Sequence, residues 1–230
     1  MKNNMVLTLL TVTLFSCANI PKNEETKEII QVQTKTIPVK SDSLYEYLTE
    51  NNFAKIKSSK LKWFNSWNQG SNHLNLSDFN VKWKKTLDFD WIEYDPYDKY
   101  LVKYDTLLIY SENKLALDLY SFNTVIDIEG ANTFVGFDVD SKVYVADKIK
   151  KERAEIANTG SYEVIEDGLW LDNKRVVLLG YTAEDANRPF VWVIDIFSKK
   201  QVAYSCKTSF NKQRSNYFLV KYPKVKLRAE

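Results

Sequence analysis

Five carboxylates follow one another closely between positions 88 and 98, and they have the clearest capacity for chemistry in this chain. They are Asp88, Asp90, Glu93, Asp95 and Asp98. Ca²⁺ takes about six to eight oxygen ligands, so Asp88, Asp90 and Asp95 are candidate ligands of a calcium ion. The spacing does not match an EF-hand loop and lacks its glycine. We therefore favour a solvated acidic loop and expect no cofactor.

Aromatic residues are interleaved with these carboxylates and form the second candidate site. The residues that we expect to contact a ligand or partner are Trp63, Trp67, Trp91, Tyr94 and Tyr97. A sugar stacks its C–H face on an aromatic ring while its hydroxyl groups bond carboxylates and amides, so this mixture is typical of a sugar-binding groove. Large aromatic side chains are mostly buried, so the alternative is that most of these rings belong to the core.

The same acidic residues keep a hydrolase open as an alternative. Two carboxylates suffice for glycoside hydrolysis, about 5–5.5 Å apart for retention or about 6.5–9.5 Å apart for inversion of configuration. Asp88, Asp90, Glu93 and Asp95 lie nearest to the aromatic residues. The single histidine, His73, excludes an HExxH or multi-histidine metal site, and no GxGxxG or GxxxxGK loop occurs. We therefore favour a protein that is not an enzyme.

The N-terminal residues indicate where the protein works. A basic start precedes an uncharged, largely apolar run over residues 6–15. A membrane-spanning helix needs about twenty apolar residues, so this run has the length of a signal-peptide core instead. The segment Leu14-Phe15-Ser16-Cys17 resembles the lipobox of bacterial lipoproteins, with Phe15 where a small residue is commoner. The alternatives are an ordinary secretory signal or an apolar first helix of a cytosolic protein.

The lipobox resemblance implies that signal peptidase II cuts before Cys17 and that Cys17 then carries lipid, palmitate included. Acyl chains contribute about 0.8 kcal/mol per buried CH₂ group, so a multiply acylated cysteine anchors a protein stably to the membrane. Ala18 stands where an inner-membrane lipoprotein carries Asp, which favours the outer membrane, facing the periplasm or the cell surface. The stretch Lys22-Asn23-Glu24-Glu25 is similar to a surface-export signal, or it is a solvated linker.

Composition separates a linker from one folded domain. Residues 18–40 contain no aromatic residue and are rich in Lys, Glu, Thr and Gln. We expect a signal peptide at 1–16, a lipidated cysteine and flexible linker at 17–40, and a single mostly β domain at 41–230. The formal net charge of +2, with no basic block, argues against nucleic acid as a partner.

Cysteine usage agrees with an envelope protein that needs no disulfide. The chain has two cysteines, Cys17 and Cys206. With Cys17 lipidated, Cys206 has no partner, so we expect no internal disulfide, no CxxC pair and no four-cysteine zinc site. Cys206 lies in a strand-like stretch, where a buried and inert thiol is expected.

Two helices and a series of strands must position these residues. A first helix is expected to follow a cap at Ser41 or Asp42 and to include Leu48, and a second to cover Lys60–Trp67. The expected strands are Val81–Lys85, Tyr100–Tyr104, Thr106–Tyr110, Lys114–Tyr120, Thr133–Asp138, Lys142–Asp147, Leu169–Leu171, Arg175–Tyr181, Phe190–Phe197, Gln201–Cys206 and Tyr217–Tyr222. Lys148–Asn158 fits either a charged helical turn or a long hairpin.

This pattern predicts a mainly β fold of antiparallel meander sheets with one or two short N-terminal helices, because sequential strands with short links pair as neighbours. Hairpin-like turns are expected at 140–142, 172–174 and 198–200. Phe190–Phe197 is apolar on both faces and should be a central strand, in which Asp195 needs a partner. The meander around it loosely resembles one β-propeller blade, so a partial propeller-like stack and a β-sandwich fit equally.

The leading hypothesis is a membrane-anchored, non-catalytic envelope lipoprotein that binds a protein or glycan partner. The alternatives are a carboxylate-dependent hydrolase acting on polysaccharide or peptidoglycan, and an envelope immunity protein that blocks a toxin. A groove with two carboxylates, one of them buried against a tryptophan, would favour the hydrolase, whereas a flat or convex aromatic patch would favour binding.

Overall fold

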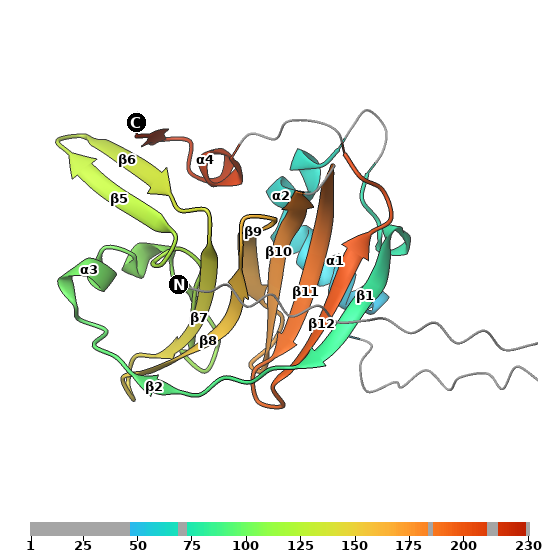
Figure 1. Ribbon diagram of the computed structural model, residues 1–230, viewed down its shortest axis with the longest axis horizontal. Helices are drawn as coiled ribbons and strands as arrows, with labels where there is room; N and C mark the ends of the chain where they lie inside the picture. The colour runs from blue at the N-terminus through green and yellow to red at the C-terminus, as the bar shows by residue number, and fades with distance from the viewer. Residues whose placement is uncertain (1–46, 69–72, 184–185, 211–215, 229–230) are drawn as a thin grey trace, which may run out of the picture. The chain divides into compact units, whose positions relative to one another are not determined.

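Runs of apolar residues at strand spacing produce three β-sheets, with short helices before them and near the C-terminal end (Figure 1). The computed structural model describes residues 47–68, 73–183, 186–210 and 216–228. The chain divides into two units, Met1–Ser41 and Asp42–Glu230, and every described residue belongs to the second. The expected signal peptide, Cys17 and the linker lie outside the described residues. No helix in the described part is long and apolar enough to cross a membrane.

The predicted mainly β, antiparallel fold with two short N-terminal helices is confirmed. The strands are β1 (Phe79–Thr86), β2 (Ile92–Glu93), β3 (Ile109–Tyr110), β4 (Ala116–Asp118), β5 (Thr124–Glu129), β6 (Asn132–Phe137), β7 (Ser141–Asp147), β8 (Glu152–Thr159), β9 (Glu163–Trp170), β10 (Arg175–Ala183), β11 (Asn187–Asp195), β12 (Lys200–Cys206) and β13 (Val225–Leu227). The helices are α1 (Glu50–Ser59), α2 (Leu61–Ser66), α3 (Lys99–Val102) and α4 (Tyr217–Lys221), with short 3₁₀ turns η2 (Leu76–Asp78) and η3 (Asp105–Leu107).

The first sheet is a five-stranded antiparallel meander in the order β1-β12-β11-β10-β9. The expected hairpins at 172–174 and 198–200 are confirmed, because they join β9 to β10 and β11 to β12. β11 is central and buried on both faces, as predicted. Its Asp195 carboxylate accepts the backbone N–H groups of Phe197 (3.0 Å) and Ser198 (2.9 Å), so the turn supplies the partner that this buried strand end requires.

The second sheet has the order β2-β8-β7-β4-β3, and the third has the order β13-β6-β5. β7 and β8 form a long hairpin, which decides between the two structures expected for Lys148–Asn158. The turn at 140–142 was expected to be a hairpin, but it joins β6 to β7, which belong to different sheets. β13 pairs in parallel with β6, so one strand pair departs from the antiparallel pattern.

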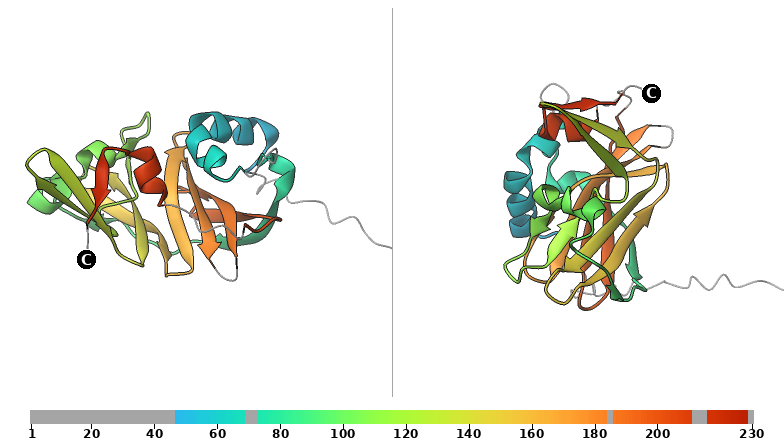
Figure 2. Two further views of the ribbon diagram at one scale, coloured as in Figure 1. Left: turned by 90° about the horizontal axis from the view of Figure 1, so that it is seen from above. Right: turned by 90° about the vertical axis from the view of Figure 1, so that its left-hand side faces the viewer.

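The first sheet has a core on each face. Helices α1 and α2 cover one face (Figure 2), where Ile56 and Trp63 pack with Leu179, Val193 and other buried residues. The opposite face shares a core with the second sheet, and this core includes Leu178, Ile194, Val143, Val145 and Ile156. This arrangement explains why β10 and β11 are apolar on both faces.

Four expected elements differ from the structure. The expected strand Thr106–Tyr110 begins in the 3₁₀ turn η3, and only Ile109–Tyr110 is a strand. Capping side chains explain the other three cases. The expected caps Ser41 and Asp42 lie outside the described residues. Leu48 was expected inside the first helix, but it precedes α1, which begins at Glu50 because the Thr49 side chain accepts the backbone N–H of Asn52. The expected strand Tyr100–Tyr104 is instead the helix α3 and its end, with Asp98 as the cap. The expected strand Tyr217–Tyr222 is the helix α4. A cap satisfies the free N–H groups of the first helical turn, and this favours a helix even where the residues prefer strands.

Candidate functional site

Two of the five expected contact residues are buried in the core. Trp63 is 0% exposed and Trp67 is 3% exposed, and both pack in the core that α1 and α2 share with the first sheet. This burial argues against a direct ligand contact by either ring, because a helix turns its largest apolar side chains toward the core. Trp91 and Tyr97 are exposed, and Tyr94 is partly buried.

The structure does not gather the candidate calcium ligands Asp88, Asp90 and Asp95 into a cluster. Among the residues that it describes, no three His, Cys, Asp or Glu side chains form a group that could hold a metal ion. Asp90 Oδ1 lies 3.7 Å from Lys199 Nζ, and Asp95 Oδ1 accepts the backbone N–H of Tyr97 at 3.0 Å. These three carboxylates lie in loops and are exposed.

Tyr94 contributes to a groove of about 430 Å³ on the outer face of the second sheet, the face opposite its core. We call it the Arg153 groove. It is lined by Glu93, Tyr94, Asp95, Asp98, Tyr100, Leu101, Ser121, Phe122, Tyr144 and Arg153. Tyr144 on β7 and Arg153 on β8 point to this face because their neighbours Val145 and Ala154 are 0% exposed in the core, and side chains alternate along a strand.

The guanidinium of Arg153 lies near two tyrosine rings. Its Cζ is 4.5 Å from the centroid of Tyr144 and 5.6 Å from that of Tyr94, both within the range of a cation–π contact. Its Nε is buried and has no hydrogen-bond partner among the described residues. The groove therefore contains a guanidinium held beside two rings, and its Nε–H group has no acceptor among the described residues.

Carboxylates line the same groove as this cation. Glu93, Asp95 and Asp98 are all exposed lining residues. The Asp98 carboxylate also accepts the backbone N–H of Tyr100 at 2.7 Å, which fixes the loop ahead of α3. Aromatic faces, acceptors and one guanidinium can bind a hydroxyl-rich ligand by stacking and hydrogen bonding.

Of the five residues expected to contact a ligand, Tyr94 lines this groove, whereas Trp91 and Tyr97 do not. Glu93, Asp95 and Asp98 of the acidic cluster line it as well, and the sequence missed the residues that come from further along the chain. Tyr144, Arg153 and Phe122 lie more than twenty residues further along the chain than Tyr100. The local signal for Arg153 is its place in a strand next to Ala154, which faces the core. Because side chains alternate along a strand, this place shows that Arg153 faces away from the core, but it does not show which residues lie beside it.

Burial raises the pKa of Tyr94 to about 12. A phenol whose pKa is higher in the folded state stabilises the fold while it stays protonated, so this stability is intact below pH 10 and is lost as the pH rises through about 12. We expect phenolate absorbance to show a group that titrates near pH 12 in the natural chain and is missing in Tyr94→Phe. The same chain in denaturant should lose this late step. Burial also raises the pKa of Tyr120, so the quantity to compare is the absorbance change near pH 12, and an equal change in Tyr94→Phe and the natural chain would contradict the assignment to Tyr94.

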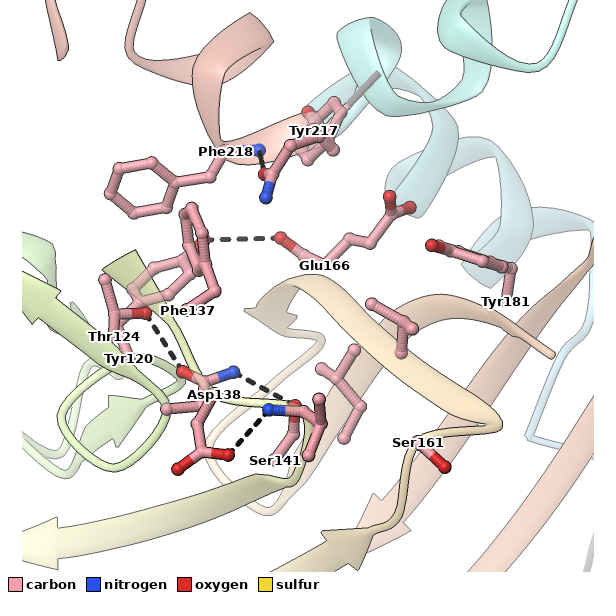
Figure 3. A pocket seen from close by; sticks show the side chains of 15 residues that line it. Tyr120, Thr124, Phe137, Asp138, Ser141, Ser161, Glu166, Tyr181, Tyr217 and Phe218 are labelled. Atoms are coloured by element: carbon pink, nitrogen blue, oxygen red, sulfur yellow. Dashed lines mark hydrogen bonds between the residues drawn. The ribbon is translucent and has the colours of Figure 1, made fainter. Parts of the chain in front are cut away.

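A second cavity, of about 380 Å³, lies where α4 meets β9 and the third sheet (Figure 3). We call it the Glu166 cavity. It is lined by Tyr120, Asn123, Thr124, Phe137, Asp138, Val139, Ser141, Ser161, Val164, Ile165, Glu166, Tyr181, Asn216, Tyr217 and Phe218. Figure 3 shows the Glu166 side chain extending between Tyr217 and Tyr181. Its Oε2 accepts the indole N–H of Trp63 at 2.8 Å, so one carboxylate is buried against a tryptophan.

A β-bulge in β9 turns two consecutive carboxylates toward the helices. β9 pairs Asp167 with Leu179 and Ile165 with Gly180, so Glu166 is the extra residue. Consecutive side chains of a regular strand point to opposite faces, whereas Glu166 reaches Trp63 and Asp167 reaches Lys60, both in the helical layer. Sequence reasoning did not single out either carboxylate, because a bulge is set by the pairing of two strands.

Asp167 is not available as a second catalytic carboxylate. It is 1% exposed, and its Oδ1 lies 2.9 Å from Lys60 Nζ and 2.8 Å from Lys221 Nζ. The other carboxylate lining the Glu166 cavity is Asp138, which is exposed and whose Oδ1 accepts the backbone N–H of Val139 at 2.7 Å. The cavity thus contains a buried carboxylate beside a tryptophan, as the hydrolase hypothesis requires, while Asp167 is committed to two lysines.

Cys206 is buried and free, and burial raises the pKa of its thiol. A buried thiol of this kind has little thiolate to react, so the expected inert role is supported.

Comparisons with protein-family models, with curated proteins and with solved structures find no match for this chain.

Proposed function

We propose that this protein is a membrane-anchored envelope lipoprotein that binds a glycan in the Arg153 groove and does not transform it. The observation that carries the proposal is the groove itself, in which Tyr94, Tyr100 and Tyr144 meet Arg153 beside exposed carboxylates. Its volume of about 430 Å³ falls within the range of about 300–1,000 Å³ that is usual for small-molecule sites.

The contacts of the groove favour a sugar over an apolar ligand. Tyr100 is 46% exposed and Phe122 is 42% exposed, so their rings offer faces on which C–H groups can stack. The carboxylates of Glu93 and Asp98 can accept hydroxyl protons, and Arg153 can donate to ring or hydroxyl oxygens. An apolar ligand would leave these polar groups desolvated without partners, which lowers affinity.

The direct test is a glycan array probed with the full chain in detergent. We expect binding to a subset of the glycans and a loss of at least about tenfold in affinity for Tyr100→Ala, because a central aromatic contact commonly carries much of the binding energy. The matched control is Tyr162→Ala, which removes a tyrosine that is 68% exposed and does not line the groove. An array without binding, together with one protein that cross-links to the groove in cells, would favour the protein partner instead.

The anchoring part of the proposal has a separate test. We expect Cys17→Ala to leave the domain folded and to move it from the membrane fraction to the soluble fraction, because the acyl chains are then missing. Fractionation at high salt, followed by circular dichroism of the released protein, measures both properties. A variant that stays with the membrane at high salt would contradict the lipid anchor.

A carboxylate-dependent hydrolase acting in the Glu166 cavity is the second candidate function. The position of Glu166 favours it, because this carboxylate lines a cavity and is held in place by the indole N–H of Trp63, so that it can exchange a proton with a bound substrate. Products released from an array glycan by the natural chain, and not by Glu166→Gln, would favour this function over binding alone.

A further inference from the structure

We infer that the ligand of the Arg153 groove carries a carboxylate and that Arg153 holds it, so that the groove takes uronic-acid-containing glycans. This inference rests on the proposed function and specifies the class of glycan. Arg153 differs from the other arginines of the described residues in its hydrogen bonding.

The other three described arginines each donate to oxygen atoms of the chain. Arg175 pairs with Asp172, Arg228 pairs with Asp127, and Arg188 donates to the carbonyl oxygens of Cys206 and Lys207 at 3.1 and 2.8 Å. Arg153 has a buried Nε with no hydrogen-bond partner among the described residues. A buried donor without a partner is unfavourable, and native proteins rarely retain one without a reason.

The neighbours of Arg153 hold its guanidinium at the groove. Arg153 pairs with Ala146 on β7 and with Ile92 on the two-residue strand β2, and neither of these partners lines the groove. Tyr144 and Tyr94 lie beside the guanidinium and restrict its movement. A guanidinium that is already oriented loses less conformational entropy on binding, and its planar fork matches the two oxygens of a carboxylate.

The acidic residues around the groove narrow the class of carboxylate. Glu93, Asp95 and Asp98 line the exposed side and repel a bare anion such as acetate or phosphate. They accept hydrogen bonds from hydroxyl groups, so they favour a carboxylate that is embedded in a hydroxyl-rich ligand. A uronic acid combines both properties within one ring, since its carboxylate can reach Arg153 while its hydroxyl groups face the acidic residues.

The experiment compares uronate-containing glycans on the array with the same glycans after methyl esterification of their carboxylates. We expect the natural chain to bind the acids at least about tenfold more tightly than the esters, because esterification removes the charge that pairs with the guanidinium. Arg153→Gln should bind acid and ester alike, at the level of the ester. Arg153→Lys, which keeps the charge without the fork, should retain part of the preference.

Lys174→Gln is the matched control, because it removes one positive charge at an exposed position outside the groove and should leave the preference intact. Melting temperatures of all variants establish that they fold. Equal binding of acid and ester by the natural chain, with binding still lost in Tyr100→Ala, would overturn the carboxylate inference and leave glycan binding standing. An array on which no glycan binds would overturn the proposed function and this inference together.

Discussion

Gly180→Ala is expected to destabilise the fold by about 3 kcal/mol or more, because β10 has no room for a methyl group at this position. A Cβ at Gly180 would lie 2.1 Å from the carbonyl oxygen of Val164 and 2.6 Å from the ring of Phe190. The first of these atoms belongs to the backbone of β9 beside its bulge, so it cannot turn away as a side chain would. Relief of the clash requires β9 and β10 to separate at the point where Glu166 and Asp167 are positioned.

Gly136→Ala on β6 is the matched control for this substitution. A Cβ at Gly136 would have no neighbour within 4 Å, so we expect a change within about 1 kcal/mol in either direction. Denaturant unfolding of the two variants and the natural chain measures both free energies. Equal effects of the two substitutions would show that the close approach of β9 to β10 does not limit what position 180 accepts.

The first sheet, whose strands β9 and β10 line part of the Glu166 cavity, could be predicted from the sequence, because its signals are local. Phe190–Phe197 alternates between two apolar faces, and the turns at 172–174 and 198–200 join strands that lie next to each other in the sheet. The strands expected at Tyr100–Tyr104 and Tyr217–Tyr222 are helices, because aromatic and β-branched residues favour strands only when no cap directs the backbone otherwise. Asp98 and Asn216 are good cap residues directly before these segments, and they are the local signal for both helices.

The two cavities depend on pairings between distant segments, and this explains what the sequence could and could not indicate. Tyr94 and the nearby carboxylates were predicted to lie together because they are close in the chain. Arg153 joins them because β2 pairs with β8, and that pairing has no signal in a two-residue strand. Trp63, Trp67 and Tyr94 are all aromatic residues that stand among polar residues in the sequence. Trp63 and Trp67 are nevertheless buried in the core beside α1 and α2. Composition therefore could not separate contact residues from core residues.

Asp167→Asn is expected to destabilise the fold by about 3–5 kcal/mol, since it leaves two partly buried ammonium groups without their shared, buried counter-ion. The Asp167 side chain is 2% exposed, and those of its partners Lys60 and Lys221 are 15% and 19% exposed. Lys60 lies at the junction of α1 and α2, and Lys221 is the last residue of α4, so this carboxylate ties the helices at both ends of the domain to the bulge in β9. Denaturant unfolding measures this loss of stability.

Asp127→Asn is the control for this substitution. Asp127 pairs with Arg228 at the surface, where their side chains are 36% and 59% exposed, so the control should lose less than about 1 kcal/mol of stability.

The pH dependence of Asp167→Asn separates lost charge pairing from lost packing. Burial lowers the pKa of Lys60, and Asp167 opposes this shift, so removing the carboxylate lowers the pKa further. A lysine with a lower pKa in the folded state binds fewer protons there than in the unfolded state, so stability increases with pH. We therefore expect the deficit of Asp167→Asn to shrink as the pH rises toward 10.5, the ordinary pKa of a lysine. A deficit that is constant up to that pH would mean that the two lysines lose their positions rather than their counter-ion, and that Asp167 acts mainly by filling space between β9 and the helices.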